Sequence, residues 1–348
     1  MDSRKYIILS VCGILITLLT VGVVVWHVDP YFQYHSPNQN MAYNMEINSF
    51  SYYNSGIAKN FSYDTVVTGS SMSRAMLPSY IDGKFNCQTV KLSMAEARGK
   101  DYQILFSLLE KNYNLKRVIM GLDTFAFSVD KDYSSYEKPM YLYDDKLLND
   151  VLYLTNIDGL IESYKVLSNT KNDGITTTMD DYQNYTLENT FSRERVVQIY
   201  NETTPITRKF EVGKQGLEEI VSRNLEQNLL PVIEDNPQVD FMFYFPPYSI
   251  VKWGITENCG DEIECMRLII KKLINYPNVS IYFYQGEKEV ITDLEHYMDT
   301  IHFDSNVANR IIDYMADDDN KLISTNYESV LNEFEKFIRD YDYSIFNN

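Results

Sequence analysis

The fold is decided by the stretch Thr65-Val66-Val67-Thr68-Gly69-Ser70-Ser71. Four β-branched residues in a row are typical of a strand, and the glycine and small hydroxyl residues after them are typical of a turn into a helix. Further β-rich runs follow at residues 87–92, 117–121, 239–245 and 279–284. The sequence therefore predicts five strands.

Helical patterns alternate with these strands. Residues 101–113 carry an apolar stripe, and residues 262–274, 306–315 and 326–340 are further predicted helices. Strands that alternate with helices indicate a parallel sheet with helices on both faces, because parallel neighbours need crossover connections. We expect an α/β fold, a five-stranded parallel sheet in a flavodoxin-like arrangement of three layers.

The alternation stops between residues 124 and 236. Helix-like stretches at residues 147–167, 192–200 and 216–230 accompany an acidic, Tyr-rich loop with no clear strand pattern. We interpret residues 124–236 as an insertion that emerges at the carboxyl ends of the strands, where open sheets place their active sites. It is expected to form a lid or a platform for an acceptor.

The composition indicates a packed chain with an acidic surface. Of the 348 residues, 45% are hydrophobic and 23% charged, which excludes intrinsic disorder. The net charge of −18 excludes a nucleic-acid partner, because phosphates would be repelled. No phosphate-binding glycine loop, dinucleotide fingerprint or metal-ligand cluster is visible in the sequence, so we expect no cofactor.

The N-terminus predicts a membrane anchor. Residues 6–26 carry no charge and would form a helix about 31 Å long, which matches a bilayer core. Arg4 and Lys5 precede this run and the next Lys or Arg is Lys59, so residues 1–5 are expected in the cytoplasm and everything after Trp26 outside the cell membrane. A cleaved secretory signal is the alternative, but no small-x-small cleavage site follows.

The rest of the chain is then extracytoplasmic. Residues 27–63 are rich in Asn, Ser and Tyr and are expected to form a tether, followed by a domain over residues 64–348. Cys259 and Cys265 could pair in an oxidising exterior, and two buried thiols are the alternative.

Two short segments carry residues suited to nucleophilic catalysis. A turn after the first strand would expose the Ser71 hydroxyl beside helix amides that can stabilise an anion, although capping of that helix is the structural alternative. His302 follows Asp299 by three residues in a predicted loop, which lets the carboxylate hold one ring nitrogen while the other faces a nucleophile. Asp293 and His296 repeat this spacing within a helix-like stretch, where a partly solvated surface position is expected.

These segments resemble the conserved blocks of a known superfamily. Gly69-Ser70-Ser71, Gly121-Leu122-Asp123 and Asp299-x-x-His302 look like blocks one, three and five of the SGNH/GDSL hydrolases. The chain is most similar to a membrane-anchored Gram-positive branch related to D-alanyl transfer to teichoic acid. Residues 29–32, 56–60 and 245–249 extend the resemblance over nearly the whole chain.

The resemblance implies a serine esterase or O-acyltransferase that acts on acyl esters of a cell-surface glycan or polymer. Ser71 would be the nucleophile, His302 the general base and Asp299 the residue that orients the imidazole. The oxyanion site or pocket would include Gly69, Ser70, Met94 and Asp123. A multi-spanning membrane acyltransferase is a candidate partner.

Two positions depart from the superfamily pattern. Asp123 replaces an asparagine that donates to the oxyanion, and a carboxylate can donate only when protonated. Residues 93–96 replace a block that normally supplies a glycine amide. A non-catalytic accessory that binds polymer or organises a surface acylation machinery is therefore the alternative function.

Overall fold

The strand that ends at Thr68 lies inside a six-stranded sheet with the order β2-β1-β3-β4-β5-β6. The strands are β1 Thr65–Thr68, β2 Thr89–Lys91, β3 Arg117–Gly121, β4 Asp240–Phe245, β5 Val279–Phe283 and β6 Lys321–Leu322. The first five run parallel and β6 pairs antiparallel with β5. The predicted α/β class is confirmed, but the predicted count misses β6, because two residues are too few for a sequence pattern.

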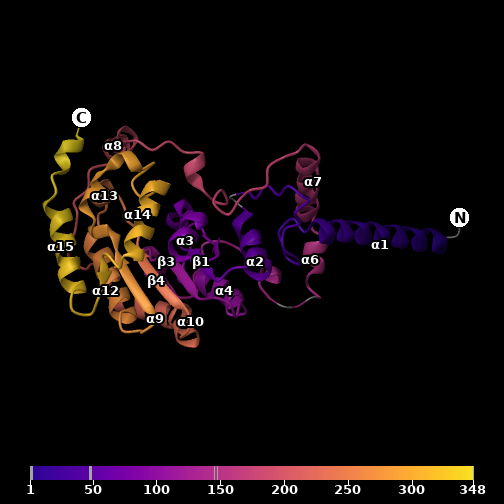
Figure 1. Cartoon of the computed structure of the whole chain (residues 1–348), viewed down its shortest axis with the longest axis horizontal. Helices are drawn as coiled ribbons and strands as arrows, with labels where there is room; N and C mark the ends of the chain where they lie inside the picture. The colour runs from indigo at the N-terminus through magenta and orange to yellow at the C-terminus, as the bar shows by residue number, and fades with distance from the viewer. Residues whose placement is uncertain (1–2, 47–48, 145, 147, 348) are drawn as a thin grey trace. The chain divides into compact units, whose positions relative to one another are not determined.

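The computed structural model describes residues 3–46, 49–144, 146 and 148–347. The chain divides into one unit of residues 63–137 and 179–348, which holds the sheet, and another of residues 1–62 and 138–178 (Figure 1). This division differs from the prediction, since only residues 138–178 of the expected insertion separate from the sheet unit. Residues 1 and 2 of the expected cytoplasmic tail, and residue 147 of a predicted helix, lie outside the described residues.

Helices flank the sheet. In chain order they are η2 Ser71–Ala75, α3 Pro78–Phe85, α4 Gly99–Leu109, α5 Thr124–Phe127, η4 Tyr185–Leu187, α8 Arg193–Glu202, α9 Leu217–Asn228, α10 Leu230–Asp235, α11 Ile250–Gly254, α12 Cys259–Leu273, η5 Tyr284–Gly286, α13 Lys288–Thr292, η6 Leu294–His296, α14 Ser305–Ala316, α15 Tyr327–Asp340 and η7 Tyr343–Phe346. α9 packs between α4 and α12, and α3 packs on α14. Because α9 packs on α4 and α12, and α10 packs on α9, both helices belong to the layered fold and not to a separate insertion.

The central strands form the core. Val66 and Val67 of β1 pair in register with Val118 and Ile119 of β3, and all four side chains are fully buried. Apolar residues on both strand faces are expected where helices cover both sides of a parallel sheet. β2 lies on one side of β1 in the sheet, and β3 lies on the other side. The direction in which successive strands are added therefore reverses between β1 and β3. Ligands of open α/β sheets bind at the carboxyl ends of strands at such a point.

The other unit contains α1 Ser3–Val28, α2 Phe50–Asn60, η3 Met140–Leu142, α6 Val151–Leu154 and α7 Ile157–Lys171. α1 is long and apolar enough to span a membrane. Directly after α1, the buried Asp29 has a φ of +45°, and its carboxylate accepts hydrogen bonds from the backbone amides of residues 33–35 and from the Tyr153 hydroxyl. Residues 27–46 and 49–62, which are most of the expected tether, therefore belong to this unit.

Cys259 and Cys265 are free, buried thiols of one helix, α12. Six residues of an α-helix span about 9 Å, which exceeds the Cα separation that a disulfide allows. The Cys259 Sγ lies 3.2 Å from the Thr256 carbonyl oxygen, and the Cys265 Sγ lies 3.5 Å from that of Thr124. The structure therefore excludes the disulfide alternative and favours two buried thiols.

Candidate active site

Ser71, His302 and Asp299 form one hydrogen-bonded chain in the sheet unit. The Ser71 Oγ lies 2.8 Å from the His302 Nε2, and the His302 Nδ1 lies 2.7 Å from the Asp299 Oδ2. An ionised carboxylate can only accept, so Nδ1 carries the ring proton and Nε2 is left to accept from the serine hydroxyl. The structure brings the three predicted residues together although Ser71 and His302 lie 231 positions apart.

The turn after β1 leaves the Ser71 side chain available. Gly69 has a φ of +142°, and a Cβ there would lie only 3.2 Å from the Gly121 nitrogen, so the turn favours glycine. Ser70 is the residue that caps η2, accepting from the Met72 amide at 3.2 Å. Capping, the structural alternative for Ser71, therefore falls to its neighbour, and the Ser71 hydroxyl points to the imidazole.

The loop that holds Asp299 and His302 is closed on itself. The Met298 amide donates to the His302 carbonyl at 3.0 Å, and the Asp299 Oδ1 accepts from the amides of Ile301 and His302, each at 2.8 Å. Burial opposes ionisation of Asp299, but the bonds from His302 and Ile301 outweigh it and hold its pKa below the ordinary value. Asp299 is therefore ionised at neutral pH, as a partner of an imidazolium requires.

The turn after β4 supports this loop. Both the amide and the hydroxyl of Ser249 donate to the Thr300 carbonyl, at 3.1 and 2.7 Å. The Tyr297 hydroxyl donates to the Pro247 carbonyl at 2.7 Å. The segment at residues 246–249 therefore fixes the position of the loop between Asp299 and His302.

Tyr185, which no sequence pattern predicts at this site, packs on the His302 imidazole. Its ring centroid lies 5.3 Å from that of His302 in an edge-on arrangement, and its hydroxyl donates to the Phe303 carbonyl at 2.7 Å. Tyr185 lies in a Tyr-rich segment with no fixed spacing from His302, so no sequence signal could have distinguished it from its neighbours.

Met94 does not supply an oxyanion donor. Its backbone amide donates to the Gly69 carbonyl at 2.9 Å, and its side chain is buried. This amide is therefore engaged within the fold, where it ties the loop after β2 to the turn after β1, and a place for Met94 in the pocket stays a prediction.

The amide of Ser71 remains as a backbone donor. At the start of η2, the Met72 amide donates to the Ser70 hydroxyl and the Ser73 amide to the Ser70 carbonyl. The Ser71 amide has no acceptor among the residues that the structure describes. This N–H group belongs to the same residue as the attacking oxygen, which makes it the candidate donor to a tetrahedral oxyanion.

Asp123 follows β3 and is buried. Its Oδ1 accepts from the Tyr248 hydroxyl. Burial raises the pKa of Asp123, and the hydroxyls of Ser70 and Tyr248 and the charges of His302 and Arg98 only partly oppose this. A raised pKa favours the protonated carboxyl, which can donate a hydrogen bond as an asparagine does.

The hydrogen-bonded chain is reachable from solvent. The side chains of His302 and Asp299 are 18% and 31% exposed, and Ser71 is half-buried. By contrast, Ser73 is fully buried and its hydroxyl donates to the Ser70 carbonyl at 2.9 Å. Only Ser71 of these two serines is therefore placed to meet a substrate.

His296 has a structural role. Its Nδ1 lies 2.8 Å from the Asp304 Oδ2, while the Asp304 Oδ1 caps α14 by accepting from the amides of Asn306 and Val307. His296 therefore steadies a helix cap at a partly exposed position, which agrees with the expected surface position.

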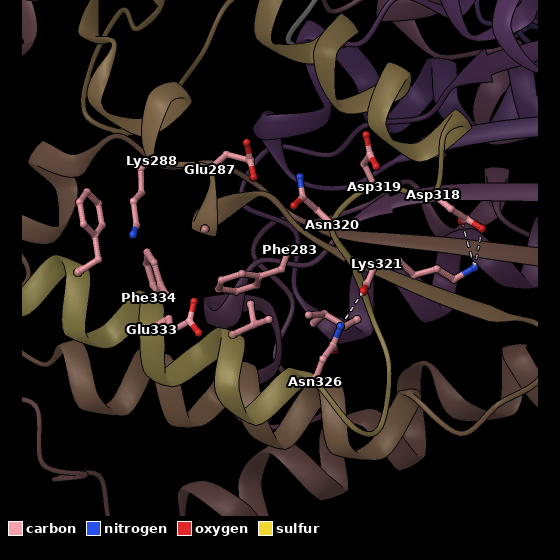
Figure 2. Close-up of a pocket in the computed structure, with 14 residues that line it drawn as sticks. Phe283, Glu287, Lys288, Asp318, Asp319, Asn320, Lys321, Asn326, Glu333 and Phe334 are labelled. Carbon is pink, nitrogen blue, oxygen red and sulfur yellow. Dashed lines mark hydrogen bonds and ion pairs between the residues drawn. The ribbon is translucent and has the colours of Figure 1, made fainter.

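A cavity of about 410 Å³ lies elsewhere in the sheet unit (Figure 2). Its walls include Phe283, the last residue of β5, and Phe334 of α15, and Lys321 pairs with Asp318 at its edge. Ser71, Asp299 and His302 are not among its lining residues. Within the described ranges, no group of three or more His, Cys, Asp or Glu side chains is arranged to hold a metal ion.

A search against protein-family models found no match to this chain, and a search of curated proteins found none either. The function is therefore inferred from the residues and their geometry.

Proposed function

We propose that this chain is a serine-dependent O-acyltransferase or esterase that acts on acyl esters of a cell-surface glycan or polymer. The observation that carries the proposal is the hydrogen-bonded chain from Ser71 through His302 to Asp299. A serine bonded to an imidazole that is itself oriented by a carboxylate is the arrangement that activates a hydroxyl for attack on a carbonyl. The same arrangement also supports the resemblance to the SGNH/GDSL hydrolases.

In the proposed reaction, the His302 Nε2 takes the proton of Ser71 as the serine oxygen forms a bond to the acyl carbon. The carbonyl electrons move to oxygen, and the Ser71 amide, with protonated Asp123 as a second donor, stabilises the charge. The intermediate then expels the alcohol of the donor ester, which takes the proton from His302. An acyl-serine remains.

A second acceptor then completes the cycle. His302 removes a proton from the acceptor, whose oxygen attacks the acyl carbon, and the Ser71 oxygen leaves and regains a proton from His302. Water as acceptor gives hydrolysis, and a glycan hydroxyl gives transfer. The resemblance favours transfer, with a multi-spanning membrane acyltransferase as the source of acyl groups.

The proposed location is the outer face of a membrane. α1 would be an uncleaved single-pass anchor with Arg4 and Lys5 on the cytoplasmic side, which would place Ser71 and the polymer in the same compartment.

The proposal is tested with full-length protein in detergent micelles. A serine-directed fluorophosphonate should label wild type and not Ser71→Ala, and an activated acetate ester reports turnover. Ser71→Ala and His302→Ala should each lower kcat/KM by roughly 10³-fold or more, and the double variant should be little worse, because nucleophile and base act as one unit. Asp299→Asn should lower kcat/KM by the same factor or a smaller one, because the substitution disturbs the orientation of the imidazole but keeps the base.

Ser73→Ala and His296→Ala are the matched controls, and both should keep most activity if their thermal unfolding midpoints match wild type. Undiminished labelling of Ser71→Ala would refute the assignment of the nucleophile. A folded wild type that neither labels nor turns over any acyl ester would favour the non-catalytic accessory instead.

A further inference from the structure

α7 turns its apolar side chains outward. Ile157, Ile161, Tyr164 and Leu167 are 69%, 46%, 71% and 44% exposed. At about 100° per residue, these four positions fall within an arc of about 120° on the helix. They therefore form one apolar stripe, which we call the α7 stripe.

The opposite face of α7 is buried although it is largely polar. Its buried residues are Gly159, Glu162, Ser163 and Val166. The Glu162 carboxylate pairs with Lys165 at 2.6 Å, and the Ser163 hydroxyl donates to the Gly159 carbonyl at 2.7 Å. A surface helix in water normally has the reverse pattern, so the α7 stripe requires an apolar environment outside the protein.

The end of α1 contacts this region. A Cβ at Gly22 would lie 3.7 Å from the Leu154 Cβ of α6, and one at Gly159 of α7 would lie 3.4 Å from Val25. Trp26 is the last residue of the uncharged run that would span the membrane. Gly22 and Val25 lie within about 6 Å of it along the helix axis. Figure 1 shows α6 and α7 running across this end of α1. If α1 spans a bilayer, α6 and α7 lie at its surface.

We propose that α6 and α7 form a membrane-interface platform that inserts the α7 stripe into the boundary between lipid head groups and acyl chains. Interfacial helices bury an apolar face about 5–10 Å into that boundary, and α1 meets α6 and α7 within about 6 Å of Trp26, at the end of its apolar run. Val151 and Leu152 of α6, each 54% exposed, add apolar surface. Trp26 and Tyr164 are exposed aromatic residues of the kind enriched at membrane interfaces.

The platform fixes the protein to lipid at a second place besides α1. A single spanning helix leaves a domain free to tilt, whereas helices lying in the interface restrict it. The occupant of the α7 stripe is lipid, so the contact forms in a bilayer that contains no other protein. This inference requires α1 to span the bilayer but does not depend on the activity of Ser71.

The test uses full-length protein in protein-free phosphatidylcholine liposomes. In a background with Cys12→Ser and Cys87→Ser, a single cysteine is introduced as Ile161→Cys or Tyr164→Cys and labelled with an environment-sensitive fluorophore. Lipids with a nitroxide near the head of the acyl chain serve as quenchers. Both labels should shift their emission to the blue and lose intensity.

The matched controls are Asp158→Cys, an exposed position off the stripe on the same helix, and Tyr113→Cys, a 99% exposed aromatic position of the sheet unit. Neither should be quenched. A further variant carries Cys87→Ser but keeps Cys12, which is labelled in the same way. Quenching of this label reports that α1 is inserted in the bilayer. Leu167→Cys replaces any stripe variant that fails to fold.

Stripe labels that behave like the control labels, in liposomes where the Cys12 label is quenched, would overturn the proposal. That result is also expected if a membrane protein, and not lipid, covers the stripe. Equal quenching at all positions would overturn it as well, because the contact would then not be specific to the α7 stripe.

Discussion

At the scale of single residues, Asp123 can act on an oxyanion only in its protonated form, because a carboxylate has no proton to donate. Its burial raises its pKa, so the protonated form persists to a higher pH than for an exposed aspartate. The contribution of this donor should therefore be present at low pH and lost as pH rises through the raised pKa.

Asp123→Asn should separate this effect from the titration of other groups. The asparagine amide donates at every pH, so the variant should keep activity on an acetate ester. Its kcat/KM should also fall less than that of wild type as the pH rises. Asp123→Ala should lower kcat by about a hundredfold, as removal of one oxyanion donor does. The measurement is the pH profile of kcat/KM, and identical profiles for wild type and Asp123→Asn would contradict the donor role.

At the scale of elements, Lys91 connects the end of β2 to η2. Its ammonium group is buried and donates to the carbonyls of Arg74 and Asp180, at 3.0 and 3.2 Å. Burial lowers the pKa of Lys91 to about 7. Between that value and the ordinary lysine pKa of about 10.4, the unfolded chain binds more protons at this residue than the folded chain, so folding stability rises with pH.

Lys91→Met should remove this dependence. Over the window above about pH 7, the free energy of unfolding of wild type relative to the variant should rise by about 1.4 kcal/mol per pH unit. Thermal unfolding midpoints at several pH values measure the difference, and comparison with the variant cancels the titration of all other groups. A constant difference across the window would show that Lys91 is not buried as the structure has it.

At the scale of the whole molecule, the positive-inside rule predicts which side of the membrane holds the sheet unit. Lys59 is the first Lys or Arg after Lys5, so the C-terminal side of α1 should face outward. Protease added to intact protoplasts should digest the sheet unit, while a cytoplasmic marker protein stays whole. Digestion that occurs only after lysis would contradict the assignment.

The sequence by itself determined the α/β class and the catalytic candidates, because both depend on local patterns. β1 and β3 have the predicted bounds, since a β-branched or apolar run that ends at glycine is a signal within a few residues. Asp299 and His302 lie three residues apart in one loop, so their hydrogen bond is a short-range property. Ser71 lies beside His302 because parallel strands place their carboxyl ends, and the turns that follow them, at one edge of the sheet.

Only the tertiary structure decided the features that depend on distant partners. Residues 138–178 belong with the N-terminal unit because α7 packs on α1, a contact that no local pattern marks. The short strand β6 exists through pairing with β5, and Tyr185 gains its role only from the ring of His302 beside it. The Met94 amide is occupied because the Gly69 carbonyl faces it. Packing and pairing across long sequence distances outweigh local propensity at each of these positions.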